Sequence, residues 1–381
     1  MKKRFAALAV IAVSCLAAPV FGAEGDAPLV KGNIEVYGAA KMSVDVIDTG
    51  AKAATADTTM NKVSSNSSRL GFKGSEDLGD GLKAVFQVEL GINMDGTTST
   101  VATGVSNTAT GAVSTTSVNT ISLRNTFVGL GSDGLGTLIF GTHDTPYKVA
   151  TGQFDAFSDT MGDYNAIMGN VNGDANFELR PRDVIAYTSP ILAGFQISAA
   201  TVLSETTNTA ISDASAHSFS AAYKAGPLAL AVAHEIHKSG IATWDAATTI
   251  TGTRVGAGYA VGGTKIGLVY ETLSDDKANS KYSRNALHAA VSQKFGKETV
   301  KLAYAKADDG EDPTTKTGAT MIVAGIDHSF SKRTAVYALY AATKNDKDAT
   351  YGLGQGGAGG AFKPGKDEDP SVISFGINHS F

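Results

Sequence analysis

The sequence predicts an all-β protein, a transmembrane antiparallel β-barrel of sixteen strands with short turns at one rim and long loops at the other. Three observations support this fold class. Long segments alternate between apolar and polar residues, short and long connections alternate along the chain, and no segment after residue 23 is apolar over the ~18 residues that a spanning helix needs. A hydrophobic content of 43% is too high for a disordered chain.

Residues 1–22 have the features of a secretory signal peptide. Residues 2–4 are basic, residues 5–13 are apolar, and the small residues that follow predict cleavage after Gly22 or, as the alternative, after Ala23. Removal of this leader takes the formal net charge from −5 to −8. The mature chain is therefore expected to be an exported, acidic barrel domain over residues 23–381, and an acidic chain argues against binding to nucleic acid.

The chain has one cysteine, Cys15, which excludes a disulfide framework and a Cys-rich metal site. A lipidated N-terminus at Cys15 is an alternative to the cleaved leader. The residue three positions earlier is Ala12 instead of the Leu of lipoprotein signals, so loss of Cys15 with the leader is the favoured interpretation.

The first segment of the predicted barrel, residues 33–46, shows the alternation most clearly. One set of alternate positions, from Ile34 to Val46, is almost wholly apolar, and the other set, from Asn33 to Asp45, is mostly polar. A period of two over this length predicts a long strand with one apolar and one polar face. The same division recurs in residues 82–92, 195–200, 300–305 and 373–381.

Two kinds of connection separate these segments. Short connections rich in turn residues are predicted at residues 76–81, 131–136, 225–227, 262–263, 295–298 and 331–334. Long polar connections are predicted at residues 47–66, 93–119, 143–182, 204–214, 238–250, 274–281, 308–316 and 344–370. A barrel in a membrane explains the regular alternation, because one rim faces the periplasm and the other faces outside.

Sixteen strands follow from these connections. They are expected to start near residues 33, 67, 82, 120, 136, 183, 194, 215, 228, 251, 264, 282, 299, 317, 333 and 371. A ten-residue strand that rises ~3.3 Å per residue at a tilt of ~45° covers roughly 24 Å, close to the apolar band of ~25 Å in such barrels. Side chains do not fill a barrel of this size, so the lumen is expected to hold water.

Closure of the sheet is required because backbone groups left unpaired in hydrocarbon cost several kcal/mol each. The segment that ends at Phe381 is therefore expected to pair with the segment that starts at Asn33. Aromatic residues near the strand ends are expected to form girdles at the two membrane interfaces. They are Phe72, Tyr223, Tyr259, Tyr270, Phe295, Tyr304 and Phe330.

Several blocks spread along the mature chain occur together and in order. They are SRLGFKG at residues 68–74 with EDLGDG at 76–81, FVGL at 127–130 with GTL at 136–138, YTSP at 187–190 with GF at 194–195, SKRT at 331–334 and the ending GINHSF at 376–381. With these blocks the chain resembles a general porin of the Gram-negative outer membrane, of the betaproteobacterial and neisserial type.

The resemblance implies a homotrimer of sixteen-stranded barrels in the outer membrane, each a water-filled channel for passive diffusion of small hydrophilic solutes and ions. It implies contact with outer-membrane lipid and lipopolysaccharide, and it implies that the terminal Phe381 acts as a signal for the barrel assembly machinery. It also implies that the third long loop, residues 143–182, folds inward and narrows the pore. No enzymatic activity, cofactor or metal is expected.

The predicted constriction has an acidic loop and a basic wall, which together set up a transverse field that orients dipolar solutes. The acidic candidates on the third loop are Asp144, Asp155, Asp159 and Asp163, whereas Asp174 and Glu178 are equally consistent with solvated loop positions. The basic candidates on early strands are Lys41, Arg69, Lys73, Lys83 and Arg124. A lipid-facing cation at the midplane costs about 2–4 kcal/mol, so Arg69 and Arg124 are expected to face the lumen.

One position departs from the family pattern. Related porins often carry Arg then Gln where this chain has Thr142-His143, which predicts a weaker basic wall and a slight preference for cations. A ligand-specific channel or a surface adhesin on the same barrel remains an alternative function. A soluble secreted β-protein is the alternative fold, and it requires the exposed apolar positions to be covered by a second sheet.

Two apparent catalytic motifs are interpreted as barrel segments. Residues 129–134 match a dinucleotide-binding glycine pattern, but they lead into another strand and not into a helix. Residues 234–237, His-Glu-Ile-His, lack the helical spacing of a zinc protease and lie in alternating sequence.

Overall fold

The structure is a computed structural model of the chain. It describes residues 33–52, 58–96, 99–100, 118–119, 121–172, 174–175, 177–203, 215–238, 249–276, 283–354 and 361–381. The predicted signal peptide, residues 1–22, lies outside the described residues. Within the described ranges, no helix has the length and apolar character required to cross a membrane.

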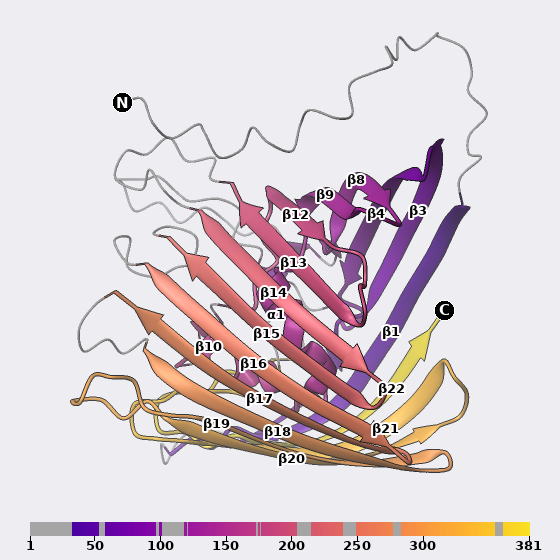
Figure 1. The fold of residues 1–381 in the computed structure, drawn as a ribbon. Coiled ribbons are helices and arrows are strands. Elements are labelled where there is room, and N and C mark those ends of the chain that lie inside the picture. Colours follow the sequence, from indigo (N-terminus) through magenta and orange to yellow (C-terminus); the bar gives the residue numbers. More distant parts are fainter. Residues whose placement is uncertain are drawn as a thin grey trace. The chain divides into compact units, whose positions relative to one another are not determined.

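Gly32–Phe381 forms one unit, built almost entirely of strands (Figure 1). The strands of the main sheet are β1 (Asn33–Asp48), β2 (Thr59–Ser65), β3 (Arg69–Gly79), β4 (Leu82–Ile92), β7 (Ile121–Leu123), β8 (Thr126–Ser132), β9 (Gly136–Thr142), β12 (Val184–Thr188), β13 (Phe195–Val202), β14 (Ala216–Ala225), β15 (Leu228–His237), β16 (Ile250–Val261), β17 (Thr264–Asp275), β18 (Arg284–Phe295), β19 (Glu298–Ala307), β20 (Ala319–Ser329), β21 (Thr334–Asn345) and β22 (Ser371–Ser380). Two small pairs lie in loops: β5 (Ser99–Thr100) with β6 (Val118–Asn119), and β10 (Asn170–Val171) with β11 (Asp174–Ala175).

These eighteen hydrogen-bonded strands make sixteen barrel strands. β2 and β3 both pair with β1, one after the other, and β7 and β8 pair in the same way with β4. Each of these two pairs is therefore one barrel strand with a short break. All neighbours are antiparallel, and β1 pairs with β22 to close the sheet. The predicted closed barrel of sixteen strands is confirmed.

The two faces of the sheet differ as the alternation predicts. On β1, Val36 and Val44 face outward and are 55% and 53% exposed. Asp45, which belongs to the other set of alternate positions, faces inward and is fully buried. On β22, Phe375 is 57% exposed while its neighbour Ser374 is buried. Outward apolar side chains that no protein atom covers are expected where hydrocarbon is the solvent.

Turn chemistry explains the short connections. The turn between β16 and β17 uses Gly262 and Gly263, both with positive φ, which is the requirement of a two-residue type I′ hairpin. One boundary differs from the prediction. The second barrel strand begins at Thr59 and not near residue 67, because the polar segment Thr59–Ser65 pairs with the outer half of β1 despite its weak apolar alternation.

The seam between the first and last strands is packed around Phe381. The amide of Gly38 donates to the carbonyl of Phe381 at 3.0 Å, and the amide of Phe381 donates back to Gly38 at 3.1 Å. A Cβ atom on Gly38 would lie 2.4 Å from the Phe381 ring and 2.8 Å from the Arg69 carbonyl oxygen. Only glycine therefore fits at position 38 while the terminal ring keeps this place.

Gly38→Ala is expected to weaken the seam by about 1–3 kcal/mol, because the added methyl group forces the ring or a backbone segment to move. The measurement is the temperature at which the folded band on a detergent gel converts to the unfolded band. Gly134→Ala is the matched control, since a Cβ there meets no atom within 4 Å. Equal conversion temperatures for the two variants would contradict the packing argument.

Candidate functional site

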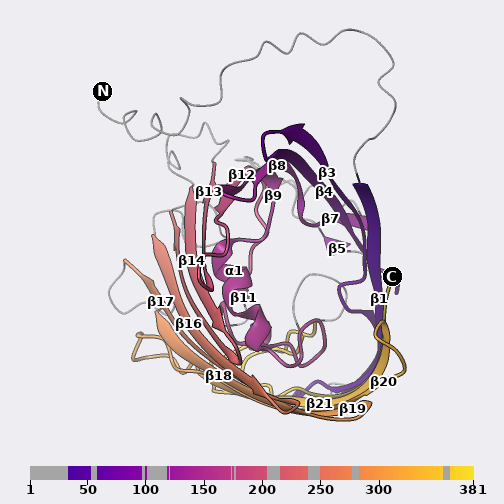
Figure 2. The same ribbon diagram turned by 45° about the vertical axis from the view of Figure 1, so that its right-hand side comes forward.

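The third long loop, residues 143–183 and here called L3, lies inside the ring of strands (Figure 2). It contains helix α1 (Pro146–Thr151) and two short 3₁₀ turns, η1 (Gly152–Phe154) and η2 (Tyr164–Ala166). The Thr145 side chain caps α1 by accepting from the Lys148 amide, and Pro146 occupies the first turn, where its missing N–H costs nothing.

Apolar packing holds L3 against the inner wall. Phe157, Met161 and Ile167 are at most 1% exposed and belong to one buried cluster with inward-facing residues of β17 to β22. Glycines on the wall make room for the loop. A Cβ on Gly256 would lie 2.4 Å from the Phe154 ring, and one on Gly267 would lie 2.4 Å from the Phe154 carbonyl oxygen.

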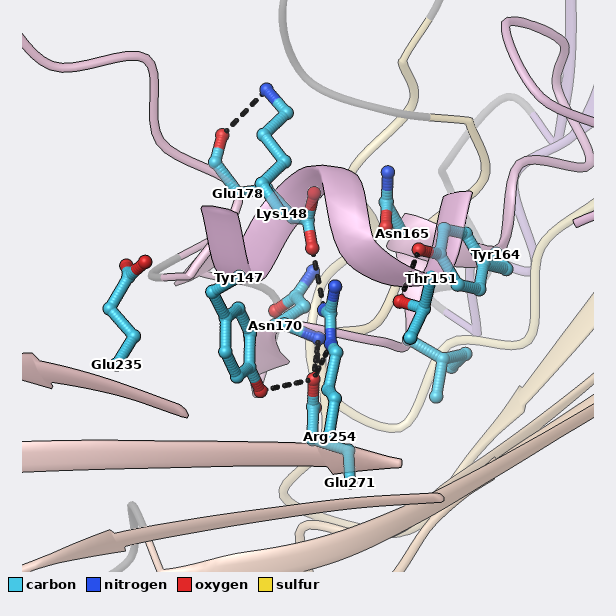
Figure 3. Close-up of polar contacts among 12 residues, drawn as sticks. Tyr147, Lys148, Thr151, Tyr164, Asn165, Asn170, Glu178, Glu235, Arg254 and Glu271 are labelled. Carbon is cyan, nitrogen blue, oxygen red and sulfur yellow. Dashed lines mark hydrogen bonds and ion pairs between the residues drawn. The ribbon is translucent and has the colours of Figure 1, made fainter. Parts of the chain in front are cut away.

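A buried ion network fixes L3 to the wall near both of its ends, at Tyr147 and at Glu178 (Figure 3). Arg254 on β16 contacts Glu271 on β17 at 2.5 Å and Glu178 of L3 at 2.5 Å. Glu271 also contacts Arg284 on β18 at 3.0 Å and accepts from the Tyr147 hydroxyl at 2.9 Å. All five side chains are buried. Breaking one partner of such a set is costly because it leaves a buried charge without compensation.

The tip of L3 reaches the opposite side of the barrel. Asp159 accepts from the Lys41 ammonium group at 2.7 Å and contacts the Arg69 guanidinium group at 3.5 Å. These side chains are 17–26% exposed, so they border the lumen without being freely solvated. The structure therefore brings together two of the predicted basic residues and one of the predicted acids.

The base of L3 carries a second charged cluster. Asp144 contacts Lys148 at 2.9 Å and Arg180 at 3.1 Å. Asn125, in the break between β7 and β8, donates to Asp144 at 3.1 Å and accepts from Arg180 at 2.9 Å, which ties the cluster to the wall. The acid at position 144 is thus paired within L3 and does not face the basic residues of β1 and β3.

The remaining predicted residues have other partners. Arg124 contacts Glu89 on β4 at 2.6 Å, and Glu89 also accepts from the Tyr37 hydroxyl at 3.0 Å. Lys73 contacts Glu35 of β1 at 3.2 Å. Lys83 contacts Asp133 at 3.1 Å, beside the turn between β8 and β9. The partners of Lys73 and Lys83 therefore lie on strands and a turn of the barrel and not on L3.

Asp155 and Asp163 stabilise the fold of L3 itself. Asp155 accepts from the backbone amides of Phe157 at 2.9 Å and Tyr164 at 3.3 Å. Asp163 accepts from the amides of Asp159 and Asn165, both at 2.9 Å. Side-chain acceptors of this kind satisfy backbone donors in turns and at helix starts.

The four loop acids differ in their pKa. Burial raises the pKa of Asp155 to about 6, although its amide hydrogen bonds partly oppose the shift, and burial with the nearby Asp155 charge holds the pKa of Asp163 well above its usual range. Burial also acts on Asp144 and Asp159, but the cations beside them outweigh it and lower the pKa of both carboxyl groups. Asp144 and Asp159 therefore stay ionised while Asp155 titrates.

Acidification from pH 7 to pH 5 is expected to increase the preference of the channel for anions. Asp155 takes up a proton in this interval, which removes negative charge from L3, whereas the lowered pKa of Asp159 keeps that carboxylate ionised. The raised pKa means that the ionised form is the less stable one in the docked loop, so protonation does not loosen L3. The measurement is the reversal potential in a KCl gradient at each pH. Burial also raises the pKa of Glu178 to about 7, so Asp155→Asn should reduce the pH dependence and Asp155→Asn with Glu178→Gln should reduce it further, whereas Asp159→Asn should keep it.

Sequence analysis missed the network residues Arg254, Glu271 and Arg284. A signal was present for one of them: Arg254 is the one charged residue of β16, and it is a direct cross-strand partner of Glu271. Glu178, which the sequence left undecided, lies in this buried network and not in solvent.

The His-Glu-Ile-His segment lies on β15, as predicted. His234 bonds to Thr253 on the outer face, whereas His237 is buried on the inner face, contacts Glu235 at 2.6 Å and stacks on Phe177 of L3. The two histidines therefore point to opposite faces. Across the described ranges, no three His, Cys, Asp or Glu side chains are placed to hold a metal ion.

A closed sheet with an apolar outer face, a charged inner face and a loop held inside defines a channel protein of the transmembrane β-barrel class. The chain belongs to the Gram-negative porin family, whose model matches residues 6–348. It is an outer-membrane channel for passive diffusion of small solutes.

Relatives and solved structures agree with this assignment. The chain is 27% identical to outer membrane porin protein 32 of Delftia acidovorans over the full length of both chains. It is 26% identical to a major outer membrane protein P.IB of Neisseria gonorrhoeae, over 80% of this chain and 86% of that protein. The anion-selective porin from Comamonas acidovorans superposes with a TM-score of 0.74 at 26% identity, over 92% of this chain and 100% of that one.

Proposed function

We propose that this porin conducts small hydrophilic anions more readily than cations, through a constriction between L3 and the wall formed by β1, β3 and β4. One observation carries the proposal. Around the constriction between L3 and this wall, the positively charged side chains outnumber the carboxylates with which they form ion pairs. The five cations are Lys41, Arg69, Arg124, Lys148 and Arg180, and the three carboxylates are Glu89, Asp144 and Asp159.

The excess of positive charge acts on a permeating ion because a narrow lumen with low-dielectric walls focuses the field. The sequence-based preference for cations came from the weaker basic wall that Thr142-His143 predicts, and Asp155 and Asp163 were predicted separately as pore acids. Both carboxyl groups accept hydrogen bonds from the backbone of L3, and the pKa of each is raised. Each therefore contributes less negative charge to the lumen than an ordinary carboxylate. The likeness to an anion-selective porin supports the revised sign.

Several further features of the family are proposed for this chain. They are cleavage of residues 1–22, assembly into a homotrimer, contact of the outer wall with lipopolysaccharide, and recognition of Phe381 by the assembly machinery. The exposed apolar band supports a lipid or protein partner for the outer wall. The exposed ring of Phe381, beside His379 at the end of β22, supports a terminal recognition element.

Reconstitution in a planar bilayer tests the proposed selectivity. In a KCl gradient the reversal potential should have the sign of an anion-preferring pore, and the current should rise linearly with salt concentration. A reversal potential of the opposite sign would overturn the proposal. Saturable block by one class of solute would instead establish a ligand-specific channel.

A further inference from the structure

Residues 346–354, the described first part of the last long connection between β21 and β22, also turn into the barrel and lie against L3. Its residues Ala349, Tyr351 and Leu353 are at most 1% exposed. They belong to the same buried apolar cluster as Met161 of L3. Residues 349–354 are called the L8 segment below.

Hydrogen bonds join the L8 segment to both ends of one stretch of L3. The Gly354 amide donates to the Met161 carbonyl oxygen at 2.9 Å. The Thr350 amide donates to Oδ1 of Asn172 at 3.1 Å, and the Thr350 hydroxyl donates to the Asn172 carbonyl oxygen at 2.5 Å. The contact therefore extends over residues 161–172 and is not a single point.

The L8 segment is itself fixed to the barrel. The side chain of Asn345, the last residue of β21, donates to the Tyr351 carbonyl oxygen at 2.8 Å and accepts from the Tyr351 amide at 2.9 Å. The Thr343 hydroxyl donates to the Gly352 carbonyl oxygen at 2.8 Å. Because these bonds fix the L8 segment to the end of β21, the segment gives L3 a fixed surface to pack against.

L3 is thus held from two sides. From the wall, Arg284 donates to the carbonyl oxygens of Ile167 at 2.8 Å and Asn170 at 3.0 Å. From the L8 segment, the Tyr351 hydroxyl contacts the same Asn170 oxygen at 3.4 Å. The tip residue Asp159, which contacts the opposite wall, lies two residues before the part of L3 that the L8 segment grips.

We propose that the L8 segment is a second positioning element of this channel, which holds L3 in place and so sets the conductance of the pore. Packing on one face alone leaves a loop free to pivot, whereas packing and hydrogen bonds on two faces leave one arrangement. Loss of the L8 contacts therefore lets L3, with Asp159 at its tip, take several positions.

Truncation combined with a cross-link tests the proposal. Tyr351→Ala with Leu353→Ala removes the apolar contact and should replace the single conductance level by fluctuating levels. Thr350→Cys with Asn172→Cys places two thiols at positions where each native side chain bonds to the backbone of the other residue, in a chain whose one cysteine, Cys15, lies in the predicted leader. The oxidised cross-link added to the truncated chain should restore the single level, and reduction should remove it again.

Met94→Ala, at an exposed residue after β4, is the control for truncation of a large apolar side chain and should keep one conductance level. Folding of each variant is checked by its mobility change on boiling in a detergent gel. A folded double truncation with the wild-type conductance level would overturn the proposal, as would failure of the two cysteines to cross-link in the folded channel. The number of conductance levels can be counted whichever ion the channel prefers, so this result is separate from the test of anion selectivity.

Discussion

Replacing Arg254 by Met is expected to release L3 from the wall and to raise the conductance of the channel. Arg254 bridges Glu178 of L3 and Glu271 of β17, and all three side chains are buried. Without the guanidinium group, Glu271 keeps Arg284 but Glu178 loses its ion-pair partner. A buried carboxylate without a partner costs about 3–5 kcal/mol. Burial raises the pKa of Glu178 to about 7 even with Arg254 beside it, so the release is expected at alkaline pH, where Glu178 avoids this cost by moving into the lumen.

Single-channel conductance and limited proteolysis of L3 in the folded protein measure the release. Arg333→Met, at an exposed position in the turn before β21, is the matched control and should behave as the wild type. Adding Glu178→Gln to Arg254→Met should recover part of the docking, because no charge is then stranded. If the single and double variants release L3 equally, the ion pair does not explain how the loop is held.

The barrel was predictable because its alternation is local. Each strand shows its lipid face within its own ten or so residues, as residues 371–380 do with Ile373, Phe375 and Ile377 on the outward side. Boundaries failed where that signal fades. Thr59–Ser65 is polar and carries no strong turn residue, and only pairing with the outer half of β1 makes it a strand.

The charged site was predictable in kind but not residue by residue. Asp155 and Asp159 lie four positions apart in a loop without periodicity, yet one bonds to its own backbone and the other to Lys41. The Arg254–Glu271 pair depends on the register between β16 and β17, which sequence alone leaves open. Contacts between loops far apart in the chain, such as Thr350 with Asn172, have no local signal at all.

Removing one cation from each doubly paired carboxylate is expected to abolish the anion preference. Asp159 has both Lys41 and Arg69 as partners, and Asp144 has both Lys148 and Arg180. In Arg69→Gln with Lys148→Gln, three cations remain against three carboxylates, and every carboxylate keeps a partner. The fold is therefore preserved while the excess charge that acts on ions disappears.

The reversal potential in a KCl gradient measures the effect, and it should fall close to zero in the double variant. Lys73→Gln with Lys83→Gln is the matched control, because it removes the same charge from residues whose partners are Glu35 and Asp133, and the wild-type sign should persist. Asp159→Asn should move the potential the opposite way, toward stronger anion preference. Equal shifts in the double variant and its control would mean that ions respond to the net charge of the barrel and not to a constriction at L3.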